Sequence, residues 1–157
     1  ANIDLKAFSD ESYRRVCGGG LSPVLDSIKL MHELGIWIEL TTLLVPGLND
    51  SKEELTQITE FIAGLDKTIP WHVSRFHPDY KMTDNVSTPV ETLELAKRVG
   101  EVKGLRYVYI GNVAGEENTY CYNCKKPVIK RFVFDVLENN LSGNRCKYCN
   151  TRLEGVY

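Results

Sequence analysis

Residues 36–50 are IWIELTTLLVPGLND, a segment typical of a strand that runs through a turn into the start of a helix. Its side chains alternate between two faces, and both faces are largely apolar apart from Glu39 and the threonines. A strand that is apolar on both faces is normally covered on both, as in a parallel sheet with helices outside. The segment therefore predicts an α/β protein, in which Glu39 either lies at the edge of the sheet or points into the mouth of a barrel.

The same alternation of strand and helix recurs through the first two thirds of the chain. Helix starts are marked by Ser22 before Pro23 and by a capping box formed by Ser51 and Glu54. This pattern predicts a parallel sheet with right-handed crossovers. We expect strands at 2–8, 36–45, 71–77 and 105–110, and helices at 10–16, 22–34, 51–65 and 88–104.

Composition and charge narrow the class of protein. The chain has 157 residues, of which 43% are hydrophobic, and a formal net charge of -2, so it can bury a core but has no bulk attraction for nucleic acid or anionic membranes. No apolar run approaches the roughly 20 residues needed to cross a bilayer, and the first residues lack the pattern of a signal peptide. We therefore expect a cytoplasmic protein. The chain also starts without Met inside an expected strand, which favours a piece of a longer protein.

Polar side chains lie on or near the expected carboxyl ends of two strands. Asp4 and Lys6 share one face of the first strand. They form either a surface pair worth less than about 1 kcal/mol or, on the dry inner face of a barrel, a ligand site. His77 ends a later strand, at the edge where α/β proteins place their chemistry. We expect His72 to have only a structural role, and residues 79–87 to form a polar loop over the same edge.

The cysteines near the carboxyl end occur in two tight pairs, Cys121 with Cys124 and Cys146 with Cys149. Two CxxC knuckles at this separation are typical of a zinc ribbon, in which four thiolates surround one Zn²⁺. With all four positions occupied by protein, such a zinc would be structural. The rival metal is iron in a rubredoxin-like site, which would make the protein an electron carrier.

We expect two domains, an α/β domain at 1–113 and a zinc ribbon at 114–157, because the helical periodicity stops at this boundary. Lys125 and Asn150 follow the two knuckles, where a left-handed backbone often favours glycine; Asn tolerates that conformation better than Lys. Cys17 has no partner in the cysteine pattern, and we expect it to be a small buried or free thiol.

Several motifs together resemble a known family. In chain order they are DLKAFSDESY, TTLLVPGLNDS, PWHVSRFHPDYKMT, RYVYIGNV and ENTYCYNC, and PWHVSRFHPDYKMT is the most distinctive. They resemble the carboxyl half of the radical S-adenosylmethionine enzymes of the AmmeMemoRadiSam system, often described as pyruvate formate-lyase activating enzyme-like. The resemblance covers essentially the whole chain. It implies that the α/β domain is the carboxyl half of a partial (β/α)6 barrel with parallel strands, followed by the zinc ribbon.

The resemblance also implies the chemistry. A [4Fe-4S] cluster and S-adenosylmethionine would lie at the carboxyl ends of the strands, where reductive cleavage gives a 5′-deoxyadenosyl radical that abstracts a hydrogen atom. In activating enzymes that hydrogen belongs to a glycine of a partner protein, so a protein substrate or other proteins of the system would be partners. By similarity, Asp4, Lys6 and His77 would contact S-adenosylmethionine, with no catalytic residue in the chain itself.

The chain departs from the family pattern at two points. The CxxxCxxC motif that holds the cluster is absent, so we expect the chain to be a fragment that is inactive alone. An Arg that activating enzymes place in the strand before the VPG motif corresponds to Thr41 here, so its cofactor contact is absent or is replaced by Glu39.

A binding module is the alternative reading. The ribbon would dock a protein or nucleic acid, with the α/β part as its scaffold. Basic and aromatic residues in the ribbon favour this, while the acidic balance of the whole chain makes strong nucleic-acid binding unexpected. The residues concerned are Tyr120, Tyr122, Lys125, Lys126, Lys130 and Arg131.

Overall fold

The computed structural model describes residues 1–133 and 135–156. The chain divides into two compact units, Ala1–Asn112 and Val113–Tyr157. The first unit is a layered α/β structure, and the second is a set of short antiparallel strands around the paired cysteines. Each unit has its own buried side chains, so each is described by itself.

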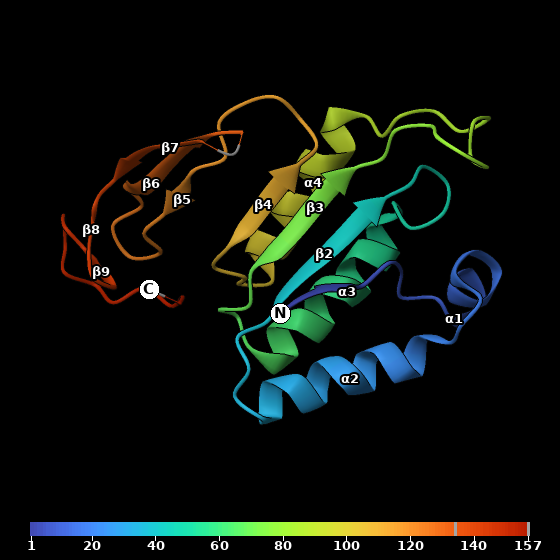
Figure 1. The fold of residues 1–157 in the computed structure, drawn as a ribbon, viewed down its shortest axis with the longest axis horizontal. Helices are drawn as coiled ribbons and strands as arrows, with labels where there is room; N and C mark the ends of the chain where they lie inside the picture. The colour runs from blue at the N-terminus through green and yellow to red at the C-terminus, as the bar shows by residue number, and fades with distance from the viewer. Residues whose placement is uncertain (134, 157) are drawn as a thin grey trace. The chain divides into compact units, whose positions relative to one another are not determined.

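The first unit is built on a four-stranded parallel sheet (Figure 1). All neighbouring strands run parallel, as the alternation of strand and helix predicts. The strand order in space is the order in the chain. The strands are β1 (Asn2–Asp4), β2 (Glu39–Leu44), β3 (Trp71–Arg75) and β4 (Val108–Gly111).

Helices connect these strands, and α3 and α4 lie on the same side of the sheet (Figure 1). Apolar side chains of α3 and α4 are fully buried together with those of one face of β2 and β3. Within the described residues, no helix is both long and apolar enough to cross a membrane. The helices are α1 (Asp10–Ser12), which continues into the π-helical turn η1 (Tyr13–Cys17), α2 (Leu21–Glu33), α3 (Lys52–Leu65) and α4 (Val90–Val102).

The expectation that the strand at 36–45 is covered on both faces is wrong. The strand starts only at Glu39, and its side chains alternate between buried and half-buried positions, with Leu40 and Leu44 fully buried. The physical reason is the strand order. When parallel strands follow one another in chain order through right-handed crossovers, the crossover helices all fall on one face. The other face of the sheet therefore carries the polar side chains.

The two predicted helix starts have different outcomes. Ser51 caps α3 as expected, because its hydroxyl accepts a hydrogen bond from the Glu54 amide at 3.1 Å. Ser22, in contrast, is not the cap of α2, which begins at Leu21. The Leu21 amide instead donates to the carboxylate of Asp10 at 2.9 Å, because the glycine turn before α2 brings α1 back beside the start of the helix.

The second unit consists of short antiparallel strands. A three-stranded sheet has the order β5-β6-β7, and a two-stranded ladder follows it. Val128 and Leu153 are buried together with two of the cysteines. Few other apolar side chains of this unit are buried, so its apolar core is small. The strands are β5 (Thr119–Tyr120), β6 (Pro127–Phe132), β7 (Asp135–Asn139), β8 (Leu141–Ser142) and β9 (Arg145–Cys146).

Candidate functional site

The uncovered face of the parallel sheet is polar. Strand register aligns Asp4 with Thr41, Thr41 with His72, and His72 with Tyr109, so one row of side chains crosses four strands. Since their neighbours Leu40, Trp71 and Val108 are buried on the helix side, alternation places this row on the opposite face. The hydrogen-bonding and charged groups of the sheet are thus collected on one surface.

Asp4 and Lys6 form an ion pair at the carboxyl end of β1. The ammonium nitrogen lies 2.8 Å from the carboxylate, and the side chains are 53% and 42% exposed for Asp4 and Lys6. Thr41, the register partner of Asp4, donates its hydroxyl hydrogen bond to Asn2 at 2.9 Å. A carboxylate and an ammonium side by side can bind a ligand that carries both charges, each group meeting its opposite.

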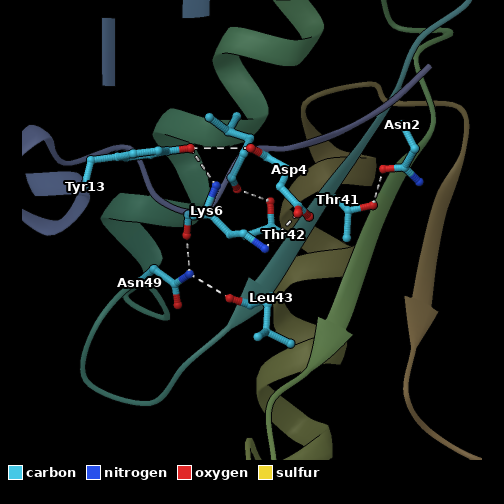
Figure 2. A network of polar contacts seen from close by, with 9 residues as sticks. Asn2, Asp4, Lys6, Tyr13, Thr41, Thr42, Leu43 and Asn49 are labelled. Atoms are coloured by element: carbon cyan, nitrogen blue, oxygen red, sulfur yellow. Dashed lines mark hydrogen bonds and ion pairs between the residues drawn. The ribbon is translucent and has the colours of Figure 1, made fainter. Parts of the chain in front are cut away.

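The backbone of Lys6 is held by side chains from η1 and from the turn after β2 (Figure 2). Its amide donates to the hydroxyl of Tyr13 at 2.8 Å, and its carbonyl accepts from the side-chain amide of Asn49 at 2.6 Å. Burial raises the pKa of Tyr13, so the phenol stays neutral. Sequence reasoning missed both residues, because no periodicity links them to β1.

His77 lies beyond the end of β3, in an exposed position. Because the strands are parallel, the carboxyl ends of β1 and β3 lie at the same edge of the sheet, with β2 between them. Among the described residues, no hydrogen bond or ion pair joins His77 to Asp4 or Lys6. The structure thus brings Asp4 and Lys6 together and leaves His77 at the same edge without contact to them.

The polar loop after His77 is closed at its base by Thr88. The Thr88 hydroxyl is buried, accepts a hydrogen bond from the amide of Phe76 at 3.1 Å and donates to the carbonyl of Leu44. Arg75 donates from its Nε to the Thr88 carbonyl at 2.8 Å. The two ends of the loop are therefore fixed to the ends of β2 and β3.

His72 has more partners than a purely structural histidine requires. Its Nε2 lies 2.7 Å from Glu39, and its ring stacks on Tyr109 with centroids 5.3 Å apart. The second carboxylate oxygen of Glu39 accepts from the indole of Trp37 at 3.1 Å. Burial acts to raise the pKa of Glu39, but the hydrogen bonds from Trp37 and His72 outweigh it and hold that pKa below its usual value. Glu39 is therefore an ionised partner of His72 at the amino end of β2.

The four paired cysteines converge in the second unit. Their sulfur atoms all lie within 4.8 Å of one another. The Sγ atoms of Cys121 and Cys149 are 3.6 Å apart, and those of Cys124 and Cys146 are 3.8 Å apart. Sulfurs around a tetrahedral zinc, at about 2.3 Å from the metal, lie about 3.8 Å from one another, whereas a disulfide requires about 2.05 Å. The donor set therefore fits a four-thiolate metal site resembling a zinc ribbon.

The two knuckles have the same backbone. Lys125 and Asn150 both have a left-handed φ, 60° and 61°, which confirms the conformation expected after each CxxC pair. Their amides donate to the carbonyls of Cys121 and Cys146, at 2.9 and 2.8 Å. Hydrogen bonds with the side chain and backbone of Thr151 lower the pKa of Cys149, another of the four clustered cysteines, to about 6.

Comparison with known proteins shows similarity to radical S-adenosylmethionine proteins. No protein-family model matches. An uncharacterized protein of Methanocaldococcus jannaschii, MJ0808, is 46% identical over 160 residues, which cover 99% of this chain and 48% of the relative. The pyruvate formate-lyase-activating enzyme of Clostridium pasteurianum is 24% identical over 107 residues, covering 61% of this chain and 43% of that enzyme. The chain thus spans about half the length of the curated relatives it matches.

Solved structures share the fold. A domain of pyruvate-formate lyase-activating enzyme from Bacteroides vulgatus superposes with a TM-score of 0.63 and 19% identity, over 71% of this chain and 66% of that domain. A radical SAM methyltransferase from Sphaerobacter thermophilus has a TM-score of 0.51 and 17% identity, over 69% of this chain and 32% of the methyltransferase. The chain therefore has an α/β fold found in radical SAM proteins.

Proposed function

We propose that this chain is the carboxyl half of a radical S-adenosylmethionine enzyme, and that Asp4 and Lys6 hold the cofactor in the complete protein. The observation that carries the proposal is the position of this ion pair. It lies at the carboxyl end of β1, on the polar face of a parallel sheet whose fold occurs in a radical SAM methyltransferase.

The strand arrangement supports a partial (β/α)6 barrel. Strands in chain order with helices on one face can be extended by further units until the sheet curves on itself, with the helix-free face inside. Asp4, Thr41 and His72 would then line the interior. A polar interior suits a bound cofactor, whereas a packed core would require apolar side chains there.

The residues present fit S-adenosylmethionine. The Asp4 carboxylate would accept hydrogen bonds from the cofactor's ammonium or ribose hydroxyls, the Lys6 ammonium would bind its carboxylate, and His77 would bond to it from the edge of the sheet. With a [4Fe-4S] cluster, the bound cofactor supplies a 5′-deoxyadenosyl radical for hydrogen abstraction. The cluster needs cysteines from outside this chain, because the four clustered cysteines form their own site and Cys17 stands apart and exposed.

Cofactor cleavage is the direct test. The protein encoded by the complete reading frame would be reconstituted with iron and sulfide without oxygen, reduced, and assayed for 5′-deoxyadenosine. We expect product from the wild type and strongly reduced product from Asp4→Asn and Lys6→Met. Lys29→Met is the matched control, because Lys29 forms an exposed ion pair on α2 and should not matter. An intact cluster that yields no 5′-deoxyadenosine would reject the proposal, and residues 1–157 alone should yield none.

The substrate class follows from the activating enzymes that the chain resembles. We propose a glycine Cα–H of a partner protein as the hydrogen donor, in a glycyl-radical-generating reaction. Incubating the reduced complete enzyme with candidate partner proteins and recording an electron paramagnetic resonance spectrum tests this. A glycyl doublet that appears only with cofactor and partner is expected, and 5′-deoxyadenosine without any protein radical would point to another substrate.

For the cysteine cluster we propose structural zinc. Four protein thiolates leave no open coordination position, so substrate cannot bind the metal. Metal analysis and colour separate zinc from iron, since a zinc protein is colourless and a rubredoxin-like iron site is red. One equivalent of zinc in protein purified from metal-replete cells is the expected result.

The alternative is a ribbon that docks a protein or nucleic acid, and two of its cations have partners within the ribbon. Lys130 is paired with Glu138 at 2.9 Å, and Arg131 donates to the hydroxyl of Thr119 at 2.7 Å. These cations are therefore engaged within the ribbon itself. Affinity that falls steeply with salt would still reveal phosphate contacts.

A further inference from the structure

The chain after β1 is held by side chains rather than by a neighbouring strand. The last ladder bond is from the Leu5 amide to the carbonyl of Thr41, at 2.9 Å. The Leu5 carbonyl accepts from the buried hydroxyl of Thr42 at 2.9 Å. The amide and carbonyl of Lys6 bond to side chains instead, as Figure 2 shows. The amide of Phe8 continues the pattern by donating to the carboxylate of Glu54.

Tyr13 holds the amide side of Lys6. Its side chain is 4% exposed, and its hydroxyl accepts the Lys6 amide hydrogen at 2.8 Å. The same hydroxyl lies 3.5 Å from the carbonyl of Asp4, a weak contact that gives it a second partner on β1. Tyr13 therefore touches the backbone of both charged residues of the pair.

Asn49 holds the carbonyl side of Lys6. It is 1% exposed, and its side-chain amide donates to the carbonyls of Lys6 and Leu43 at 2.6 and 2.9 Å. Its side-chain oxygen accepts from the amide of Val45 at 2.7 Å. All of these bonds go to backbone groups, so Asn49 fastens the segment after β1 to the end of β2.

Both peptide groups that flank the Cα of Lys6 are therefore fixed by buried side chains, while the ammonium remains accessible and paired with Asp4. Satisfying buried backbone groups is an ordinary structural role. Here the fixed backbone also sets the point from which the Lys6 side chain reaches the polar face of the sheet. We propose that Tyr13 and Asn49 are positioning residues for Lys6, so that they determine the affinity for S-adenosylmethionine without touching it. This inference rests on the proposed function.

The test compares two variants of the reconstituted complete enzyme, each of which lacks one buried hydroxyl. Tyr13→Phe removes the bond to Lys6, whereas Thr59→Val removes a buried hydroxyl whose bonds, among the described residues, go to carbonyls of α3. We expect Tyr13→Phe to raise the Kd and KM for S-adenosylmethionine about five-fold, the equivalent of one ordinary hydrogen bond, with kcat at saturation unchanged. Thr59→Val should lower thermal stability comparably and leave Kd unchanged. Equal Kd for wild type and Tyr13→Phe, or equal weakening in both variants, overturns the proposal.

Amide hydrogen exchange on residues 1–157 distinguishes failure of the positioning role from failure of the proposed function. In Tyr13→Phe the Lys6 amide should exchange faster than in the wild type, and in Thr59→Val it should not. Faster exchange with unchanged cofactor affinity would reject the positioning role and leave the proposed function standing. A wild-type complete enzyme that binds no S-adenosylmethionine would reject the proposed function and the positioning role with it. Asn49→Asp, which keeps the acceptor and loses both donors, should weaken affinity in the same direction if it folds.

Discussion

Lys125 and Asn150 adopt the same left-handed backbone, although their side chains tolerate it differently. Asn enters this region readily because its short polar side chain can bond locally, whereas Lys has no such compensation. The Lys125 conformation is held by the hydrogen bond from its amide to the Cys121 carbonyl and by the adjacent clustered cysteines. The first knuckle therefore carries a local strain that the second largely lacks.

Relief of that strain should be measurable. Lys125→Gly is expected to stabilise the zinc-loaded ribbon by about 0.5–1 kcal/mol, because glycine adopts a left-handed φ without the side-chain penalty but loses more entropy on folding. Chemical unfolding of the zinc-loaded protein would measure it. Lys126→Gly is the control, since Lys126 has no positive φ and should gain nothing. Destabilisation by Lys125→Gly would argue against a strained knuckle.

Glu39 gives the sheet a predictable pH dependence. Its pKa is lower in the folded protein than in the unfolded chain, where it is about 4.3, so its contribution is complete above that pH and is lost as pH falls through the folded pKa. Because its side chain is 36% exposed, the contribution should be less than about 1 kcal/mol. The stabilities of Glu39→Gln and wild type should differ at pH 7 and converge once the pH falls below the lowered pKa of Glu39. A difference that persists in acid would show that the effect is not ionic.

At the scale of elements, sequence patterns predicted the parallel sheet and most helices because these depend on local periodicity. Sequence patterns did not predict features that depend on contacts between different elements. The uncovered face of β2 could not be inferred, since its side chains are apolar enough to be buried and only the strand order shows which face the helices cover. Tyr13 and Asn49 were missed for a related reason, because both bond to Lys6, which is distant from them in sequence. The pairing of Asp4 with Lys6 could be inferred because residues two apart in an extended segment point to the same side, although β1 itself ends at Asp4; their binding of a ligand stays a prediction.

The cap of α2 illustrates such a contact between elements and can be tested. Asp10→Ala should lower thermal stability more than Ser22→Ala. Asp10 accepts the Leu21 amide hydrogen and also pairs with Arg14, whereas the Ser22 hydroxyl donates to Asp26 on the exposed surface of the helix. Thermal unfolding followed by circular dichroism gives both values. The hydrogen bond from Leu21 and the contact with Arg14 hold the pKa of Asp10 below its usual value, so the difference should shrink in acid. An equal loss of thermal stability in the two variants would show that Ser22 contributes as much to the start of α2 as Asp10.

At the scale of the whole molecule, the two units depend on different sources of stability. The α/β unit buries an apolar layer between its sheet and helices, including Trp71, Leu55 and Leu93. The cysteine unit has a much smaller apolar core, so we expect metal binding to supply much of its folding free energy, as in small zinc domains. Loss of the metal should therefore affect one unit and spare the other.

Cysteine replacement tests this independence. Cys121→Ser or Cys146→Ser should unfold the ribbon and leave the α/β unit largely intact. The tryptophans, Trp37 and Trp71, both belong to the α/β unit, so tryptophan emission should keep its wild-type value while a metallochromic dye reports released zinc. A strong chelator should reproduce the result with the wild-type protein, and Cys17→Ser is the matched control because Cys17 lies outside the cluster. Loss of all helical signal would show that the units do not fold separately.

Thr88 has a consequence for how this scaffold can vary. Its hydroxyl joins the ends of β2 and β3 directly, so the sheet does not rely on residues 78–87 for its alignment. We therefore expect that this loop can be lengthened, shortened or replaced while the strands keep their register. A grafted loop should therefore retain the parent's melting temperature as long as Thr88 is kept.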